Sequence, residues 1–327
     1  MLLVENNNHD PAWNLALDEY LLTQFTEEVL SLWRNGPAVI IGRNQNALEE
    51  IDLEFIRERG VPVVRRMTGG GAVFHDLGNV NFTLAQPCEA GDFSNYEKFT
   101  RPIIRFLDTL GVRAELSGRN DLLLEGMKFS GNAQTVRGGR ILHHGTLLFS
   151  TDMADLSGAL RPRSLKLESR GVKSVASRVT NISSHLNSPM EVEDFLSGLR
   201  SFFLRDVPGL QVYPLTERDR QAVDRLKGEK YGTWEWTFGA APPYTWSRAV
   251  KYPFGLVDVR LDIRKGRIGQ VSIFGDFFGQ REVPELERAL EGLPHRREEL
   301  LVRARELPLE EYISGMTPEE FVELLCG

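Results

Sequence analysis

The segment RRMTGGGAVFHDLGNVNF, residues 65–82, joins two predicted strands through three consecutive glycines. VPVVRR at 61–66 predicts a buried strand, and the alternation in NVNFTLA at 79–85 predicts a second one. Glycines have no Cβ atom, so a phosphate could approach the N–H groups of the turn closely. The turn is neither a Walker loop nor a G-x-G-x-x-G fingerprint. An anion-binding turn is therefore one interpretation, and a flexible turn is the other.

Two arginines stand at the end of the first strand. Arg65 and Arg66 are consecutive, so their side chains leave the strand on opposite sides and one of them should face the turn. A guanidinium there would offer planar N–H donors to a phosphate. The alternative is that both arginines are solvated at the surface. We favour the phosphate site, because glycines and arginines occur together.

A lysine between apolar residues marks a second segment, GRNDLLLEGMKFSGNAQ at 118–134. Lys128 lies between Met127 and Phe129 on a predicted strand, where an ammonium would be poorly solvated without an anionic partner. Gly126 and Gly131 leave room for a ligand against the backbone. A lysine at the sheet edge whose ammonium reaches solvent is the structural alternative.

The histidines do not form an evident metal site. His143 and His144 are adjacent on a predicted strand, so they should project to opposite faces, one into the core and one exposed. His75 adds a third imidazole, but no H-E-x-x-H or carboxylate spacing completes a ligand set.

Composition excludes several classes of protein. The chain has 327 residues, 41% of them hydrophobic, and a net charge of −7, which gives no general footprint for nucleic acid or an anionic membrane. MLLVENNNHD lacks the features of a signal peptide, and no apolar stretch is long enough to span a membrane. Cys88 and Cys326 have no metal or redox spacing, and Cys88 is expected to be a structural thiol. These features favour a soluble protein in the reducing cytoplasm.

The remaining pattern predicts an α+β fold. Helices are expected at 8–22, from a cap at Asp52 to Arg59, at 96–110, 190–205 and 216–227, and strands at 30–33, 38–42, 121–124, 128–136 and 141–149, the first two paired with each other. These elements predict a large domain, 1–240, with a mixed, mostly antiparallel sheet.

A smaller α+β accessory domain is expected at 247–327, with strands in GLVDVRLDIRKG and RIGQVSIFGD, a turn at Lys265–Gly266 and short helices after them. The stretch 231–246 is rich in glycine, proline and aromatic residues, and we interpret it as a hinge-like connector.

These segments together resemble the lipoate–protein ligase A family, which shares its catalytic fold with the biotin–protein ligases. The matching text is VENNNHDPAWNLALDEYLL at 4–22, RRMTGGGAVFHDLGNVNF, GRNDLLLEGMKFSGNAQ, HHGTLLF at 143–149 and RVTNI at 178–182. The resemblance covers nearly the whole chain. It implies activation of lipoate by ATP to lipoyl-AMP, followed by transfer of the lipoyl group to a lysine of a carrier domain.

The resemblance also implies roles for individual residues. Lys128 matches the essential lysine that contacts both the phosphate and the acyl carbonyl. Matches to the adenylate-binding loop and further candidate ligand-binding residues are Arg66, Gly70, Gly71, Ala72, Val73, Phe74, Asn79, Asp121 and His144. Mg²⁺ is expected with ATP, and Asp121 could be one of its ligands or simply a turn carboxylate. Val80 and Phe82 could line the slot for the lipoyl tail.

Two other functions remain possible. An octanoyl- or lipoyl-transferase of the same fold would work through a cysteine thioester, and Cys88 is the cysteine in the catalytic domain. A non-catalytic lipoate-binding protein would be expected to have lost Lys128 or the glycine turn. The separate C-terminal segment and the intact motifs favour the ligase.

The expected protein partners are the lipoyl domains of dehydrogenase E2 subunits, the glycine-cleavage H protein, or both. Since an adenylate needs shielding from water, we also expect the C-terminal domain to move when it forms, about a hinge with Gly232, Gly239 and Pro242-Pro243.

Overall fold

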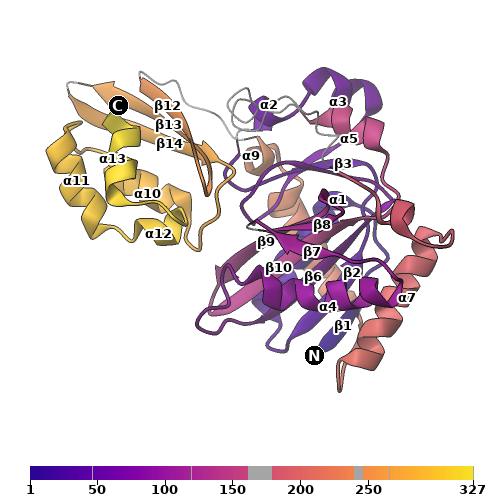
Figure 1. Ribbon diagram of the computed structural model, residues 1–327. Helices are drawn as coiled ribbons and strands as arrows, with labels where there is room; N and C mark the ends of the chain where they lie inside the picture. The colour runs from indigo at the N-terminus through magenta and orange to yellow at the C-terminus, as the bar shows by residue number, and fades with distance from the viewer. Residues whose placement is uncertain (46, 119, 161–178, 239–245, 265, 327) are drawn as a thin grey trace.

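The computed structural model describes residues 1–45, 47–118, 120–160, 179–238, 246–264 and 266–326 (Figure 1). These residues form a large α+β domain and, from β12 onward, a smaller domain of one sheet with helices, drawn orange to yellow. The fold class is therefore the one expected. No helix in the described part of the chain is long and apolar enough to cross a membrane.

Eight of the described strands form the large sheet. Their order is β11 (Gln211–Pro214), β1 (Leu2–Glu5), β2 (Val29–Trp33), β6 (Asn79–Pro87), β10 (Arg140–Leu148), β9 (Met127–Arg137), β8 (Asp121–Leu124) and β7 (Glu115–Ser117). β1 is parallel to both of its neighbours, and the other pairs are antiparallel. This confirms the mixed, mostly antiparallel sheet.

One face of this sheet carries the main apolar core. Helices α4 (Tyr96–Thr109) and α7 (Val192–Asp206) pack there (Figure 1). Phe99 and Phe195 of these helices lie in one cluster with Val80, Phe82 and Phe129 of the sheet. Each large apolar side chain buried in this way contributes about 1.5–3 kcal/mol.

The opposite face is covered by helix α1 (Pro11–Gln24) and a second sheet. Asp10 caps α1, since its side chain accepts from the N–H groups of Ala12 and Trp13. The second sheet has the order β4 (Val63–Arg65), β3 (Ala38–Ile41), β5 (Val73–His75). The polar residues Asn14, Asp18 and Glu19 of α1 are buried, because the helix contacts both sheets and α8 (Glu217–Leu226).

The expected pairing of strands 30–33 and 38–42 is wrong. β2 lies between β1 and β6 in the large sheet, whereas β3 is the central strand of the small one. The chain between them changes sheets at Asn35, whose buried side chain bonds to Asn14 and His75. Side-chain hydrogen bonds to other elements hold this turn, and sequence periodicity does not reveal them.

The remaining described elements of the large domain are short, and the capped helix at 53–59 is one of them. Asp52 Oδ1 accepts from Phe55 N–H at 3.1 Å, as expected for that cap. These elements are α2 (Ala47–Glu50), α3 (Leu53–Arg59), α5 (Met153–Ala159), a 3₁₀ turn (Ile182–His185), η3 (Lys227–Tyr231) and α9 (Trp234–Thr237).

The first part of the expected connector belongs to the large domain instead. Tyr231 is 1% exposed and packs in the core beneath α1, and Thr237 is also buried. The interpretation of 231–238 as a hinge is therefore wrong, because Tyr231, Trp236 and Thr237 pack into the domain. Gly239 and Pro242-Pro243 lie outside the described residues.

The C-terminal domain has its own core. Strands β12 (Trp246–Tyr252), β13 (Gly255–Arg264) and β14 (Arg267–Gly275) form an antiparallel sheet. Helices α10 (Val283–Leu290), α11 (Arg297–Glu306), α12 (Leu309–Tyr312) and α13 (Pro318–Cys326) accompany it. The two strands expected here are confirmed, β12 was not foreseen, and Lys265 of the expected turn lies outside the described residues.

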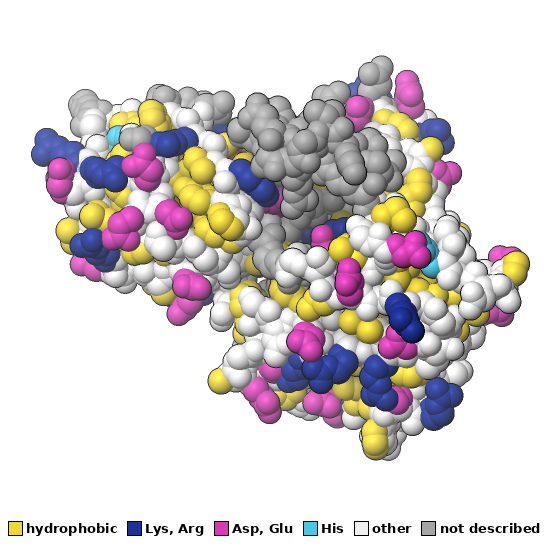
Figure 2. Space-filling view, in the orientation of Figure 1, with side chains coloured by type: hydrophobic (Ala, Val, Ile, Leu, Met, Phe, Trp, Pro, Cys, Tyr) yellow, Lys and Arg dark blue, Asp and Glu magenta, His cyan; other side chains and the backbone are white. Residues whose placement is uncertain are grey.

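On the visible face of the molecule, charges of both signs are interspersed (Figure 2).

Candidate active site

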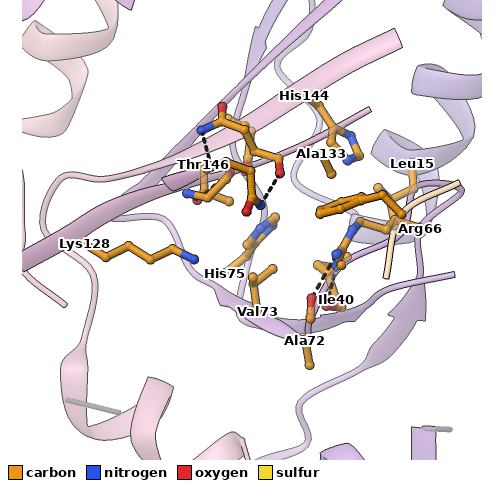
Figure 3. Close-up of a pocket in the computed structure, with 18 of the residues that line it drawn as sticks. Leu15, Ile40, Arg66, Ala72, Val73, His75, Lys128, Ala133, His144 and Thr146 are labelled. Carbon is orange, nitrogen blue, oxygen red and sulfur yellow. Dashed lines mark hydrogen bonds between the residues drawn. The ribbon is translucent and has the colours of Figure 1, made fainter. Parts of the chain in front are cut away.

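A pocket lies between the α1 side of the large sheet and the small sheet with its glycine loop (Figure 3). It is lined by residues of both sheets, of α1 and of the C-terminal domain. They are Leu15, Trp33, Ile40, Arg66, Gly70, Gly71, Ala72, Val73, His75, Asn81, Asn120, Lys128, Gly131, Asn132, Ala133, His144, Gly145, Thr146 and Phe278.

A row of neighbouring residues crosses the large sheet beneath this pocket. Trp33 of β2 is in register with Asn81 of β6, which is in register with Thr146 of β10. Gly131 of β9 donates its N–H to Thr146 Oγ1 at 3.1 Å and is in register with Asp121 of β8. The row therefore connects the Lys128 side of the pocket with Trp33.

Lys128 forms an ion pair at one side of the pocket. Its ammonium lies 2.8 Å from Asp121 Oδ1, and each of the two side chains is 36% exposed. The lysine thus has an anionic partner and contact with solvent, and Figure 3 shows its ammonium directed toward the middle of the pocket. A Cβ atom at Gly131 would lie 3.1 Å from Lys128 Nζ, so the glycine leaves the space that the side chain uses.

Both arginines of the glycine motif are buried, and neither is solvated at the surface. Arg66 donates to the carbonyls of Gly69 and Gly71 at 2.6 and 2.9 Å, and to Thr68 Oγ1. Arg65 donates to carbonyls at 42, 43, 45, 236 and 237. Arg66 is therefore the arginine that faces the loop, but its guanidinium donates hydrogen bonds to carbonyls of the loop itself.

The two buried guanidinium groups place positive charge beside the loop. Within the described chain their acceptors are carbonyl and hydroxyl oxygens, and none is a carboxylate. Burial lowers the pKa of Arg65 and of Arg66 to about 10, so both are charged at neutral pH. Their charge favours a negative group beside the loop.

The loop glycines have different surroundings. Gly70 has φ +92°, and a Cβ there would lie 2.9 Å from Arg66 Nη2 and 3.1 Å from Phe278 Cζ. A Cβ at Gly71 would meet no atom within 4 Å, so this residue borders open space. Gly71 is thus the position at which a side chain would enter the pocket without straining the loop.

The two histidines of β10 lie on opposite faces, as expected, but both are buried. His143 stacks on Phe99 with ring centroids 4.9 Å apart. His144 bonds to Asp18 Oδ2 and Thr68 Oγ1, each at 2.8 Å. The expectation that one is exposed is wrong, because helices or loops cover both faces of the sheet. Burial lowers the pKa of His143 well below its usual value.

Some residues expected at the site lie elsewhere. Phe74 is in the core beside the small sheet, and Asn79 is fully buried with its side-chain N–H₂ bonded to Asn81 Oδ1. Val80 and Phe82, expected to line the tail slot, face α4 instead. Strand side chains alternate in direction, so it is Asn81, between them, that lines the pocket. The strand was correctly predicted, but the choice of face was wrong.

Several lining residues were not foreseen from the sequence as site residues, and they include Leu15, Trp33, His75, Thr146 and Phe278. Apolar residues such as Leu15 and Trp33 have the pattern of core residues, so no local signal distinguishes them. His75 was set aside with the metal sites, although it belongs to the glycine motif.

The C-terminal domain contributes to the pocket directly. Phe278 is 3% exposed and lines the pocket beside Gly70. The contact is supported by hydrogen bonds from Gly275 N–H to Asn44 O and from Gly70 N–H to Phe277 O, and by an ion pair between Arg43 and Glu282.

The two cysteines are absent from the pocket wall. Cys88 follows β6 and donates its N–H to Gly139 O at the far hairpin, seven residues from Asn81. At 3.3 Å per residue this is ~23 Å along the strand. Burial also raises the pKa of the Cys88 thiol, and Cys326 lies in α13.

Comparison with known proteins identifies the family and the fold. Residues 10–203 match the lipoyl protein ligase A/B catalytic domain, and residues 241–325 match the bacterial lipoate protein ligase C-terminus. The chain is 42% identical to the lipoate-protein ligase LplJ of Bacillus subtilis, over 99% of this chain and all of that protein. It is 38% identical to lipoate–protein ligase 1 of Staphylococcus aureus, with the same coverage.

Solved structures agree. LipL1 of P. falciparum in complex with lipoate superimposes over all of this chain and 98% of its own, with a TM-score of 0.80 and 25% identity. The match to a lipoate-protein ligase A bound with ATP spans 72% of this chain and 98% of that one, with a TM-score of 0.64 and 27% identity. A bipartite ligase from Thermoplasma acidophilum, described with its E2 lipoyl domain, covers 75% of this chain and 98% of its own, with a TM-score of 0.65 and 28% identity. The chain therefore belongs to the lipoate–protein ligase family and is an enzyme of that type.

Proposed function

We propose that the enzyme activates lipoate with ATP to form lipoyl-AMP and then transfers the lipoyl group to a lysine of a lipoyl carrier domain. The observation that carries this proposal is the position of Lys128. Its ammonium reaches into a pocket that also borders the glycine loop, so one cation can serve both phosphate and acyl group.

In the first half-reaction a carboxylate oxygen of lipoate attacks the α-phosphorus of ATP. The bond from that phosphorus to the bridging oxygen breaks, and pyrophosphate leaves. Negative charge grows on the phosphoryl oxygens and on the leaving group, so fixed cations and N–H donors lower the barrier. Lys128 and the glycine loop, with Arg65 and Arg66 buried beneath it, supply that environment.

In the second half-reaction the amine of the carrier lysine attacks the acyl carbon. The bond between that carbon and the AMP oxygen breaks, AMP leaves, and the amine loses a proton as the amide forms. The oxygen of the tetrahedral intermediate carries a negative charge, and the Lys128 ammonium would stabilise it.

The lipoyl tail would follow the row of residues across the large sheet. With its carboxylate at Lys128, the chain passes Gly131 and Thr146 toward Asn81 and Trp33. Strands are about 4.8 Å apart, so an extended eight-carbon acid covers about two strand spacings, ~10 Å. Leu15 and Ile40 supply apolar walls for it.

We expect Mg²⁺ to arrive with the ATP phosphates. In the described part of the chain, no three His, Cys, Asp or Glu side chains gather into a metal-binding group. Asp121 could approach a metal, but its Oδ1 already accepts from Lys128. Binding through substrate phosphates, with few protein ligands, is the usual mode for this ion.

The position of Cys88 argues against the thioester transferase as the second candidate. A nucleophilic thiol must reach the acyl carbon, and Cys88 lies at the other end of β6 from the pocket. The presence of Lys128 and of the glycine loop supports catalysis over simple binding. E2 lipoyl domains, the H protein, or both are the proposed carriers, with the reaction in the cytoplasm.

The test is exchange of labelled pyrophosphate into ATP, with lipoate as the added acid. We expect exchange that depends on lipoate, and a mass increase of one lipoyl group on an added lipoyl domain. Exchange without lipoate, or lipoyl transfer from an acyl donor with no need of ATP, would contradict the proposal.

A further inference from the structure

Two residues of the pocket wall near Trp33 carry side-chain nitrogens that have no partner among the described residues. His75 Nε2 and Asn81 Nδ2 are buried and have no hydrogen-bond partner among the described residues. The two side chains are 4% and 2% exposed, and both residues line the pocket. The Trp33 and His75 rings lie edge to face with centroids 6.2 Å apart. Unpaired polar groups at such a position are costly unless a ligand satisfies them.

A chain of asparagine side chains determines which nitrogen of His75 carries the proton. Asn14 Nδ2 lies 2.9 Å from Asn8 O and 3.1 Å from Arg34 O, and backbone carbonyls only accept. The same Nδ2 donates to Asn35 Oδ1 at 2.7 Å, so Asn35 must present its N–H₂ group to His75 Nδ1, 3.0 Å away.

His75 Nδ1 is therefore an acceptor, and its neutral ring carries the proton on Nε2. Burial, together with the nearby Arg66 and His144, lowers the pKa of His75 to about 3, so the ring is neutral at physiological pH. His75 consequently offers an N–H donor without a charge, and Asn81 offers a second one.

We propose that these two donors recognise the sulfur atoms of the dithiolane ring and so select lipoate over acids with a purely hydrocarbon tail. The proposal rests on the proposed function, because that function places the lipoyl tail along the row from Lys128 to Trp33. Disulfide sulfur is polarizable and a weak acceptor, whereas a methylene group accepts nothing. A hydrocarbon tail would leave both donors buried and unpaired.

This selection differs from selection by shape. A pocket that only measures shape distinguishes poorly between groups of similar size, whereas unpaired buried donors penalise the ligand that lacks an acceptor. The best comparison is 5-cyclopentylpentanoate, which has the five-membered ring and chain of lipoate but no sulfur. Octanoate then adds the effect of removing the ring.

The experiment measures binding of each free acid by calorimetry and, separately, acid-dependent pyrophosphate exchange. We expect the unmodified enzyme to prefer lipoate over 5-cyclopentylpentanoate by about ten-fold, which corresponds to 1.4 kcal/mol. Asn81→Leu and His75→Phe remove one donor each at similar volume. Each should reduce the preference several-fold, through KM and Kd rather than kcat.

Thr151→Val is the matched control. Thr151 Oγ1 is also buried and has no partner in the described part of the chain, but Thr151 does not line the pocket, so this change should affect all three acids equally. Thermal unfolding identifies any variant that fails to fold, and the ligand series on the unmodified enzyme tests the proposal without mutation.

The outcomes separate this proposal from the proposed function. Equal affinity of the unmodified enzyme for lipoate and 5-cyclopentylpentanoate would overturn the sulfur proposal even if exchange is normal. Selective lipoate binding that both substitutions weaken, with no exchange, would support it while contradicting adenylation. An unchanged preference in both folded variants would overturn it.

Discussion

The polar side chains at the two ends of the pocket differ in charge and in burial. At one end Lys128 and Asp121 form an ion pair whose side chains are each 36% exposed. At the other end His75 and Asn81 are almost wholly buried and neutral. A full charge costs little free energy where water and a counter-ion reach it, whereas in a buried site a neutral hydrogen-bond donor is less costly than a charged one. The comparison suggests that chemistry is located at the open end and selection at the buried end.

The glycine loop borders the same pocket and combines the features of its two ends. Its charge comes from guanidinium groups that are buried but bonded to carbonyl and hydroxyl oxygens. The loop can therefore be rigid and positive at the same time. Phe278 of the C-terminal domain lies against it, so the loop is also where the two domains meet.

The largest effect is expected at the open end. Lys128→Ala should lower pyrophosphate exchange by at least ~10²–10³, because the ammonium acts on charge that develops in the transition state. The fold should persist, since the side chain is partly exposed. Lys98→Ala is the matched control, because that lysine also has a carboxylate partner, Asp92, but lies on α4. Normal exchange in folded Lys128→Ala would mean that the open end of the pocket takes no part in adenylate formation.

The loop should respond next. Gly71→Val should weaken ATP binding by about ten-fold or more with little change in melting temperature, because the new side chain enters open pocket space. Gly70→Val should both weaken binding and destabilise the protein, since φ is +92° and Arg66 is close. Calorimetry and thermal unfolding distinguish the two. Unchanged ATP affinity in Gly71→Val would mean that the loop is only a turn.

Movement of the C-terminal domain would connect the loop to catalysis. We expect small-angle scattering to change when a non-hydrolysable lipoyl-adenylate analogue binds, because Phe278 lies in the pocket and would have to be displaced or repacked. Phe278→Ala should reduce the concentration of analogue needed by a few-fold. Identical profiles, with full-rate adenylate formation by a chain truncated near residue 245, would favour a rigidly docked domain.

The buried end of the pocket should affect how the free energy of unfolding changes as the pH falls. The pKa of His75 is lowered to about 3, below its value in the unfolded chain, ~6.5. The unfolded state therefore binds the proton first as pH falls, and stability is lost between about pH 6.5 and 3, by ~1.4 kcal/mol per unit. In His75→Phe the slope of unfolding free energy between pH 6 and 4 should fall by one proton equivalent. An unaltered slope would mean that His75 is not held neutral.

The smallest effect is expected for the cysteine at the far end of β6. Cys88→Ser should lipoylate a carrier domain at nearly the normal rate, because Cys88 is remote from the pocket. An acyl group trapped on Cys88 and detected by mass spectrometry would reverse this conclusion and favour the transferase.

Much of this site could be predicted from contiguous residues. The glycine turn between two strands and the lysine between apolar neighbours are local patterns, and both contribute to the pocket. The predictions were wrong where one sequence pattern is compatible with two structures. Alternation in 79–85 correctly predicted a strand, but it left open which face the slot occupies, and Asn81 rather than Phe82 lines it.

The sequence by itself determined the strand–glycine–strand unit, the amphipathic helices and the resemblance that indicates lipoate chemistry, because these depend on residues close together in the chain. Only the tertiary structure decided that β2 and β3 belong to different sheets, that Arg66 binds its own loop and that Phe278 reaches the pocket. The state of His75 is of the same kind, since it depends on Asn14 and Asn35 from other elements. Contacts between distant residues arise from packing, and local periodicity carries no information about which distant partners meet.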